Sequence, residues 1–237
     1  MGKKKYYMVI DTETVNGRMV YDFGVTVIDR TGNVVDNMSY VCAEFINDPN
    51  SVNLLTDMFA KRRIAWYYYN LFANTDAFEV MPFAEIITIM NALCEKYDAI
   101  LCAYNAAFDK DALDKTAKYF GYEKFFATDA EWQDIWNMAM SVLCNSRNYL
   151  KFCKSNGLET ERGNIQTGAE AIYRYLCNNP HFEEKHTAYE DTKIEAAILT
   201  TVIKRKKKTD TAIVGNCQGN KNWQVITNRY KTKYSKE

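Results

Sequence analysis

The sequence predicts an α/β fold in which a mixed β-sheet is flanked by helices. Three strand-like segments follow one another near the N-terminus, and helical and strand-like segments then alternate along the rest of the chain. A meander followed by such an alternation is typical of a sheet covered by helices. With 237 residues, the chain is long enough for one large domain, or for one domain with an appendage.

The three N-terminal strands are predicted from short runs of strand-forming residues. The first run extends from Lys5 to Ile10 and stops at Asp11, and the next two cover Tyr21 to Ile28 and Val34 to Cys42. Between the second and third runs, the segment 29–33 reads D-R-T-G-N, which is the composition of a hairpin turn. We therefore expect three consecutive antiparallel strands.

The alternating elements are predicted from hydrophobic periodicity. A helical pattern opens at Pro82, which we place near the first helical position, and ends near Tyr97. A buried strand over 99–103 and a helix over 107–120 follow, and a last amphipathic helix comes after Asp191. This order predicts helices on the sheet of the N-terminal strands.

Composition excludes several classes of protein. Apolar residues make up 47% of the chain and charged residues 25%, as in ordinary soluble globular proteins. No apolar run approaches the length of a membrane span, and the N-terminal residues match neither a secretory signal nor a lipid-anchor motif, so we expect a cytoplasmic protein without membrane contact. The cysteines form no C-x-x-C pair, so they predict neither disulfides nor a zinc cluster and are expected to be small core residues. There are seven of them, Cys42, Cys94, Cys102, Cys144, Cys153, Cys177 and Cys217.

The formal net charge is zero, but the C-terminal segment is strongly basic. Residues 204–237 hold ten Lys or Arg against two acidic residues, a net charge of +8. We therefore divide the chain into a domain over 1–203 and a basic tail over 204–237. Such a tail favours contact with a polyanion, and the alternatives are a disordered, solvated tail or a short hairpin docked on a partner protein.

The residues that indicate chemistry are acidic and lie at the ends of predicted elements. Asp11 and Glu13 follow the first strand, and alternation along an extended backbone points both side chains to one face. Chance alone predicts roughly one D-x-E pair in a chain with this many acidic residues. Asp129 and Glu131 are a second copy. Only the first copy directly follows a strand, so we assign the chemistry to that copy.

Two further acidic residues stand where helices are predicted to begin. Asp109 closes the motif N-A-A-F-D, which starts at Asn105 just beyond a buried strand. A helix-capping aspartate is the alternative role for this residue. Asp191 closes the motif H-T-A-Y-E-D, which starts at His186. His186 taken alone could equally be an ordinary surface or packed histidine.

These three motifs, in this order, resemble those of the DEDDh (DnaQ-like) 3′–5′ exonucleases, the family of bacterial proofreading subunits and RNase T. The resemblance spans residues 6–200 and implies an RNase H-like fold. The related branch of the family would have a tyrosine four residues before the last aspartate, where this chain has Thr187. The match implies that Asp11, Glu13, Asp109 and Asp191 bind metal and that His186 is the general base.

The chemistry of these residue types supports the resemblance. Gathered carboxylates repel one another and raise each other's pKa unless cations neutralise them, and two divalent cations balance four carboxylates. Oxygen ligands favour Mg²⁺ or Mn²⁺, and a pair of such ions can support in-line displacement at a phosphodiester. A neutral imidazole can accept the proton of the attacking water. We therefore expect two divalent cations, Mg²⁺ or Mn²⁺, as cofactors.

The predicted function is a 3′–5′ exonuclease that releases nucleoside monophosphates from the ends of single-stranded DNA. One alternative is an exoribonuclease that trims RNA, because no residue here distinguishes the two sugars. Another is a non-catalytic module that binds nucleic acid or a polymerase, although the complete set of five site residues argues against it. The expected partner is single-stranded nucleic acid with a 3′ end, and a polymerase or another replication protein is a further candidate.

Three segments depart from the family pattern. Leu54 to Phe72 contains K-R-R at 61–63 and W-Y-Y-Y at 66–69, which could form a substrate-facing surface or a helix packed on the sheet. The tail carries aromatic residues among its basic ones and is predicted to add substrate affinity rather than chemistry. Asp134 begins a D-I-W segment where relatives often start a strand, and its role is left open.

Overall fold

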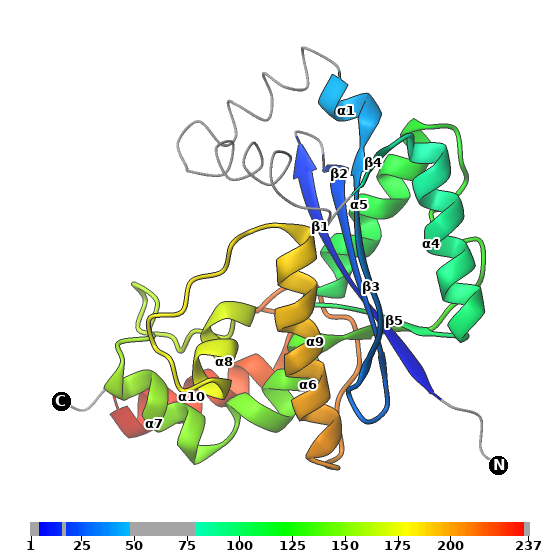
Figure 1. Ribbon diagram of the computed structural model, residues 1–237. Helices are drawn as coiled ribbons and strands as arrows, with labels where there is room; N and C mark the ends of the chain where they lie inside the picture. Colours follow the sequence, from blue (N-terminus) through cyan, green and yellow to red (C-terminus); the bar gives the residue numbers. More distant parts are fainter. Residues whose placement is uncertain (1–4, 16–17, 48–78, 235–237) are drawn as a thin grey trace.

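The structure is a computed structural model that describes residues 5–15, 18–47 and 79–234. Its centre is a six-stranded mixed sheet with the strand order β4-β3-β2-β1-β5-β6, and helices lie on both sides of it (Figure 1). The predicted fold class is therefore confirmed. The strands are β1 (Tyr6–Val15), β2 (Met19–Asp29), β3 (Val34–Cys42), β4 (Glu79–Met81), β5 (Ile100–Ala103) and β6 (Trp132–Asp134). The helices are α1 (Ala43–Asn47), α4 (Phe83–Tyr97), α5 (Ala106–Tyr119), α6 (Ile135–Ala139), the π-helical turn η1 (Met140–Cys144), α7 (Arg147–Ser155), α8 (Ala169–Leu176), α9 (Ala188–Lys204) and α10 (Lys221–Tyr234).

The N-terminal meander forms as expected. Strands β1, β2 and β3 pair antiparallel in sequence order. At the β2–β3 turn, Gly32 has a φ of +85°, a conformation that glycine adopts without a steric penalty. Strand β1 is longer than predicted, because it continues through Asp11 and Glu13 to Val15. The two acidic residues therefore lie within the strand rather than after its end.

The remaining strands join the meander in parallel. Strand β5 pairs with β1, β6 pairs with β5, and β4 pairs with β3. Pro82 is the N-cap of α4 rather than its first residue. Asp134, whose role the sequence left open, is the last residue of β6 and the N-cap of α6, where its side chain accepts a hydrogen bond from the backbone N–H of Asn137. These connections bring the ends of β1 and β5 to the same edge of the sheet.

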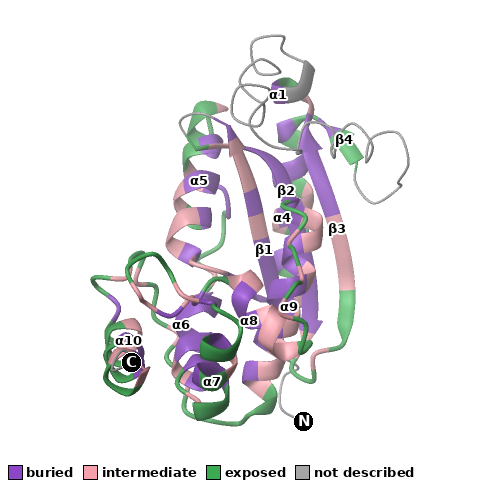
Figure 2. Ribbon diagram, turned by 90° about the vertical axis from the view of Figure 1, so that its left-hand side faces the viewer, coloured by how far each residue is buried: buried purple, intermediate pink, exposed green. Residues whose placement is uncertain are grey.

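The core has two halves, one on each face of the sheet. Tyr7 and Val9 of β1 pack with α6, η1 and α9, whereas Met8 and Ile10 pack with α4 and α5. Figure 2 shows buried residues along the central strands and on the helix faces that cover them. Since side chains alternate along a strand, the odd-numbered positions of β1 face α9.

The C-terminal segment folds back onto the domain. Helix α10 lies against η1, and its Ile226 and Tyr230 are buried in the same core half as α9. The side-chain amide of Asn220 donates to Asn137 Oδ1 of α6 at 3.2 Å. Over its described residues, this segment is neither the disordered tail nor the hairpin that the sequence left open.

Five of the seven cysteines are buried as predicted, but Cys177 is exposed and Cys217 is only partly buried. The K-R-R and W-Y-Y-Y segments at 61–63 and 66–69 lie outside the described residues. None of the described helices is long and apolar enough to cross a membrane.

Candidate active site

Strand β1 places Asp11 and Glu13 on the face of the sheet that α9 covers. In the antiparallel register, Asp11 lies opposite Gly24 of β2 and Glu13 lies opposite Asp22. The intervening residue, Thr12, points to the other face, where α5 packs. Alternation along one strand thus presents two carboxylates to α9 and a hydroxyl to α5.

Gly24 lets the first turn of α9 approach the sheet. A Cβ atom at this position would lie 2.0 Å from the carbonyl oxygen of Ala188, the first residue of α9. The helix start is also anchored beside Glu13, because the backbone N–H of Ala188 donates to Asp22 Oδ2 at 3.1 Å. Thr187 caps the helix by accepting a hydrogen bond from the backbone N–H of Glu190. Together these contacts fix the first turn of α9, which carries Asp191, on the sheet opposite Asp11.

The structure brings three of the predicted ligands together. Carboxylate oxygens of Asp11, Glu13 and Asp191 lie within 4.8 Å of one another. Asp191 is 9% exposed, and its Oδ1 atom is buried without a hydrogen-bond partner. Hard divalent cations prefer such oxygen donors, and a buried carboxylate oxygen without a donor is satisfied by a cation. This three-carboxylate group could therefore hold a divalent cation.

Asp109 lies beside the three-carboxylate group but not within it. It belongs to the first turn of α5, is 3% exposed, and accepts a hydrogen bond from Thr12 Oγ1 at 2.8 Å. The capping alternative is wrong, because the N-cap of α5 is Asn105 in the left-handed conformation. Asp109 is thus held by the β1 residue that separates Asp11 from Glu13, and its charge contributes to the raised pKa values of both.

Burial and mutual repulsion raise the pKa values of these carboxyl groups. Burial is the main cause at each residue; it raises the pKa of Asp109 to about 7 and that of Asp191 to about 8. The pKa values of Asp11 and Glu13 are also raised well above the usual range, by burial and then by the neighbouring carboxylates. A cation in the group would remove this repulsion, so the electrostatics favour metal binding.

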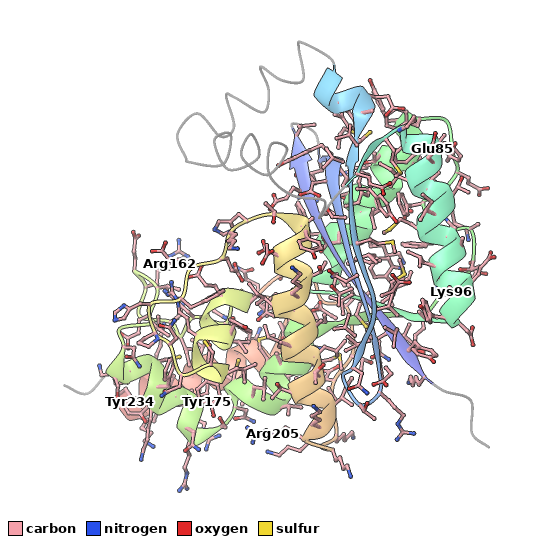
Figure 3. The ribbon with its side chains drawn as sticks, viewed as in Figure 1. Glu85, Lys96, Arg162, Tyr175, Arg205 and Tyr234 are labelled. Carbon is pink, nitrogen blue, oxygen red and sulfur yellow. The ribbon has the colours of Figure 1, made fainter. Side chains whose placement is uncertain are left out.

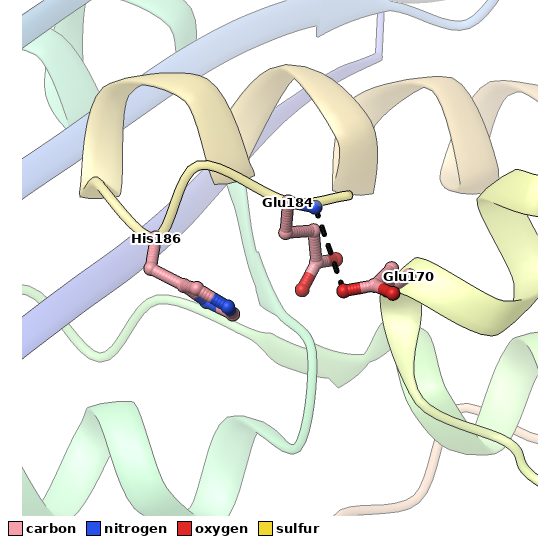
Figure 4. A group of neighbouring side chains, drawn as sticks. All are labelled: Glu170, Glu184 and His186. Atoms are coloured by element: carbon pink, nitrogen blue, oxygen red, sulfur yellow. Dashed lines mark hydrogen bonds between the residues drawn. The ribbon is translucent and has the colours of Figure 1, made fainter. Parts of the chain in front are cut away.

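His186 lies in a second group rather than among the three carboxylates. One of its ring nitrogens and a carboxylate oxygen from each of Glu170 and Glu184 lie within 4.8 Å of one another (Figure 4). The histidine is exposed, with a φ of +54°, just before the cap of α9. The two groups are coupled through Glu184, whose charge is a main electrostatic contribution to the raised pKa of Asp191.

Several acidic residues of this region were not identified from the sequence. Glu195 lies one turn after Asp191 on α9, is 4% exposed, and accepts a hydrogen bond from the backbone N–H of Tyr104 at 3.3 Å. Its charge contributes to the raised pKa of Asp11. Helical spacing could have indicated Glu195, because residues four apart share a face. Asp22, Glu170 and Glu184 gave no comparable signal, since only tertiary structure brings them here.

Comparison with solved structures supports the fold. The chain aligns with E. coli exonuclease I in complex with a 5cy-dT13 oligonucleotide at a TM-score of 0.55 and 15% identity, covering 86% of this chain and 41% of that one. It also aligns with a 3′-exonuclease that recognises the histone mRNA stem-loop at a TM-score of 0.53 and 14% identity, covering 90% and 69%. No protein-family model and no curated protein matches the chain.

At such identities the likeness establishes the architecture, so the RNase H-like sheet predicted from the motifs is confirmed. The chain spans about two fifths of the length of exonuclease I.

Proposed function

We propose that this protein is a metal-dependent 3′–5′ exonuclease that hydrolyses phosphodiester bonds at single-stranded DNA ends and releases nucleoside monophosphates. The observation that carries the proposal is the three-carboxylate group, in which Asp11, Glu13 and Asp191 come within 4.8 Å although the chain separates them by up to 180 positions. Asp109, fixed by Thr12, stands beside it. The exonuclease neighbours of the same fold support this chemistry.

Each residue has a definite task in the proposed reaction. Asp11, Glu13, Asp109 and Asp191 would hold two divalent cations, Mg²⁺ or Mn²⁺. When bound, such cations stabilise the charge that develops on the phosphate and leaving oxygens. A ring nitrogen of His186 accepts the proton of the attacking water, and Glu170 and Glu184 stabilise the imidazolium that results, because they lie within 4.8 Å of it.

The alternative substrate is RNA. It is supported by the second neighbour described above, which recognises a histone mRNA stem-loop, and the same carboxylate chemistry serves either sugar. A non-catalytic role agrees less well with the gathered carboxylates, because buried, repelling carboxylates destabilise a fold that does not bind cations. A polymerase partner remains a prediction from the sequence.

The decisive experiment uses defined ends. Purified protein is incubated with single strands of DNA and of RNA that carry a label at the 3′ or the 5′ end, and with a circular single strand, in Mg²⁺, Mn²⁺ or excess chelator. We expect immediate release of 3′-labelled mononucleotide, gradual shortening of 5′-labelled strands, and an intact circle. Cleavage of the circle, or full turnover in excess chelator, would contradict the proposal.

A further inference from the structure

A groove of about 720 Å³ lies between two segments that are far apart in the sequence. One wall is the loop 160–168 with the start of α8, and the other is the segment 217–223 that leads into α10. Sites that take a ligand of drug-like size, which a nucleotide matches, have volumes of roughly 300 to 1,000 Å³. The groove is therefore large enough for part of a nucleic-acid strand.

Hydrogen bonds fix both walls of this groove. In the loop, the backbone N–H of Thr160 donates to the carbonyl of Asn164 at 2.8 Å, which closes the turn that carries Arg162. In the other wall, Asn220 Oδ1 accepts from the backbone N–H of Trp223 at 3.0 Å. The walls are joined because Tyr230 of α10 donates a hydrogen bond to Glu159. The lining side chains are thus held on a preformed scaffold.

The lining side chains suit a single strand. Arg162 is exposed and makes no ion pair within the part of the chain that the structure describes, so its guanidinium can bind a phosphate. Trp223 is half-buried at the opposite wall and offers a ring on which a base can stack. Gln166 and Gln218 add amide donors and acceptors for base edges. These are the three kinds of contact that nucleotides require.

Two acidic residues, Glu161 and Glu170, also line the groove, and Glu170 links it to His186. Glu161 is exposed beside Arg162, whereas Glu170 forms an ion pair with Arg174 of the same helix. Glu170 lines the groove and is also a member of the group with Glu184 and His186 (Figure 4). At Glu170 the groove therefore adjoins the group that contains His186, and its other lining residues include Arg162 and Trp223.

We propose that this groove binds the nucleotides of a single-stranded nucleic acid that precede the scissile phosphate, with Arg162 on the backbone and Trp223 against a base. The proposal rests on the proposed nuclease function, because the continuity between the groove and His186 gives the strand its path. It assigns the C-terminal segment a defined part in substrate binding, through the residues around 217–223 rather than through its basic run at 204–208.

The test measures strand binding separately from cleavage. Labelled ten-nucleotide strands of dT and of U are titrated in Mg²⁺ with full-length Asp11→Asn protein, which is expected to bind without cleaving, over a series of salt concentrations. Arg162→Ala, Trp223→Leu and the control Arg205→Ala are each added to this background. Figure 3 shows Arg205 at the C-terminal end of α9, away from the helix start that carries Asp191, and Arg162 in the loop beside α8. Leucine at 223 keeps an apolar side chain against the core, and thermal melts verify folding.

The expected results separate charge from stacking. Arg162→Ala should weaken binding and lower the salt slope by about 0.7, the contribution of one phosphate contact on a single strand. Trp223→Leu should raise Kd roughly five- to 150-fold with the salt slope unchanged. Arg205→Ala should change neither quantity.

Two outcomes would overturn the proposal at different levels. If the wild-type protein degrades single strands while both groove variants, Arg162→Ala and Trp223→Leu, bind like the parent, the strand takes another path and only the groove assignment is wrong. If the wild-type protein neither binds nor degrades any strand, the nuclease function itself is wrong. If the groove serves a protein partner instead, the groove variants will bind the strand like the parent, which is the first of these outcomes.

Discussion

The protein contains the motif D-x-E twice, in two different environments. Asp11 and Glu13 lie in the central strand, face α9, and have pKa values raised well above the usual range by burial and by neighbouring carboxylates. Asp129 is fully exposed before β6 and forms a 3.0 Å ion pair with Lys124. The same three-residue pattern is thus a candidate active site in one place and solvated surface in the other.

The comparison shows that the chemistry depends on what faces the motif. The first copy meets Asp191 because Gly24 leaves room for the start of α9, and it meets Asp109 because Thr12 donates a hydrogen bond to that residue. The second copy instead lies on the surface, where Asp129 pairs with Lys124. A buried group of carboxylates without cations is repulsive, so the first copy should respond to metal and to neutralisation, and the second should not.

The largest expected effect is on turnover. Asp11→Asn should lower the rate of nucleotide release by more than about 100-fold, because residues that only orient metal ligands are already worth 10- to 100-fold. The matched change Asp129→Asn should leave the rate unchanged. Steady-state rates with a 3′-labelled single strand measure both. Equal losses in the two variants would remove the distinction between the two copies.

A smaller effect is expected at the histidines, which offer a second matched pair. His186→Ala should lower turnover by roughly 10² to 10⁴, the usual contribution of a general base, while Mn²⁺ affinity stays close to that of the wild type. His181 is exposed on the same loop, and His181→Ala should behave as the wild type. Turnover and calorimetric Mn²⁺ binding are measured for each variant. A loss of Mn²⁺ affinity in His186→Ala as large as that in Asp191→Ala would make His186 a ligand.

The smallest effect concerns stability, and its sign follows from the pKa values. Burial raises the pKa of Asp109 to about 7 and that of Asp191 to about 8, whereas the unfolded value is about 3.9. The folded protein therefore binds more protons than the unfolded chain, and its stability without metal is complete below about pH 4 and falls as the pH rises through 7 and 8. Added Mg²⁺ or Mn²⁺ should reverse the loss.

Thermal melts of the metal-free protein measure this effect. At pH 8, Asp11→Asn should raise the Tm, because it replaces a carboxyl group whose charged form the folded protein disfavours, and each kcal/mol gained corresponds to about 2–4 °C in a chain of this size. Asp129→Asn should leave the Tm unchanged. A lower Tm for Asp11→Asn in the absence of metal would show that repulsion does not dominate this group.

Local sequence patterns predicted much of the fold. The meander and the alternating elements were identified because their apolar residues recur at strand or helix spacing. Helix α10 was not identified, although Trp223, Ile226, Tyr230 and Tyr234 recur at helical intervals. Its many basic residues directed attention to charge, and the packing of these apolar residues against η1 and α9 decides their role.

The sequence predicted only part of the candidate site, because some of its residues are brought there by tertiary contacts rather than by a local motif. Asp11, Glu13, Asp109 and Asp191 are recognisable because each belongs to a motif at the end of an element that the sequence predicts. Asp22 lies in the middle of β2 and acts by anchoring Ala188, a contact across 166 positions that no local pattern encodes. The position of His186 beside Glu170 and Glu184 depends in the same way on how α8 packs against α9.

The contact between Gly24 and Ala188 has a consequence for synthesis. A ribosome makes β1 and β2 early and α9 late, and domains generally fold as their residues become available. Until α9 has emerged and docked at Gly24, the growing polypeptide holds Asp11 and Glu13 without Asp191. No nascent chain that ends before α9 can assemble the three-carboxylate group, so translation must pass α9 before a cation can find all three carboxylates together.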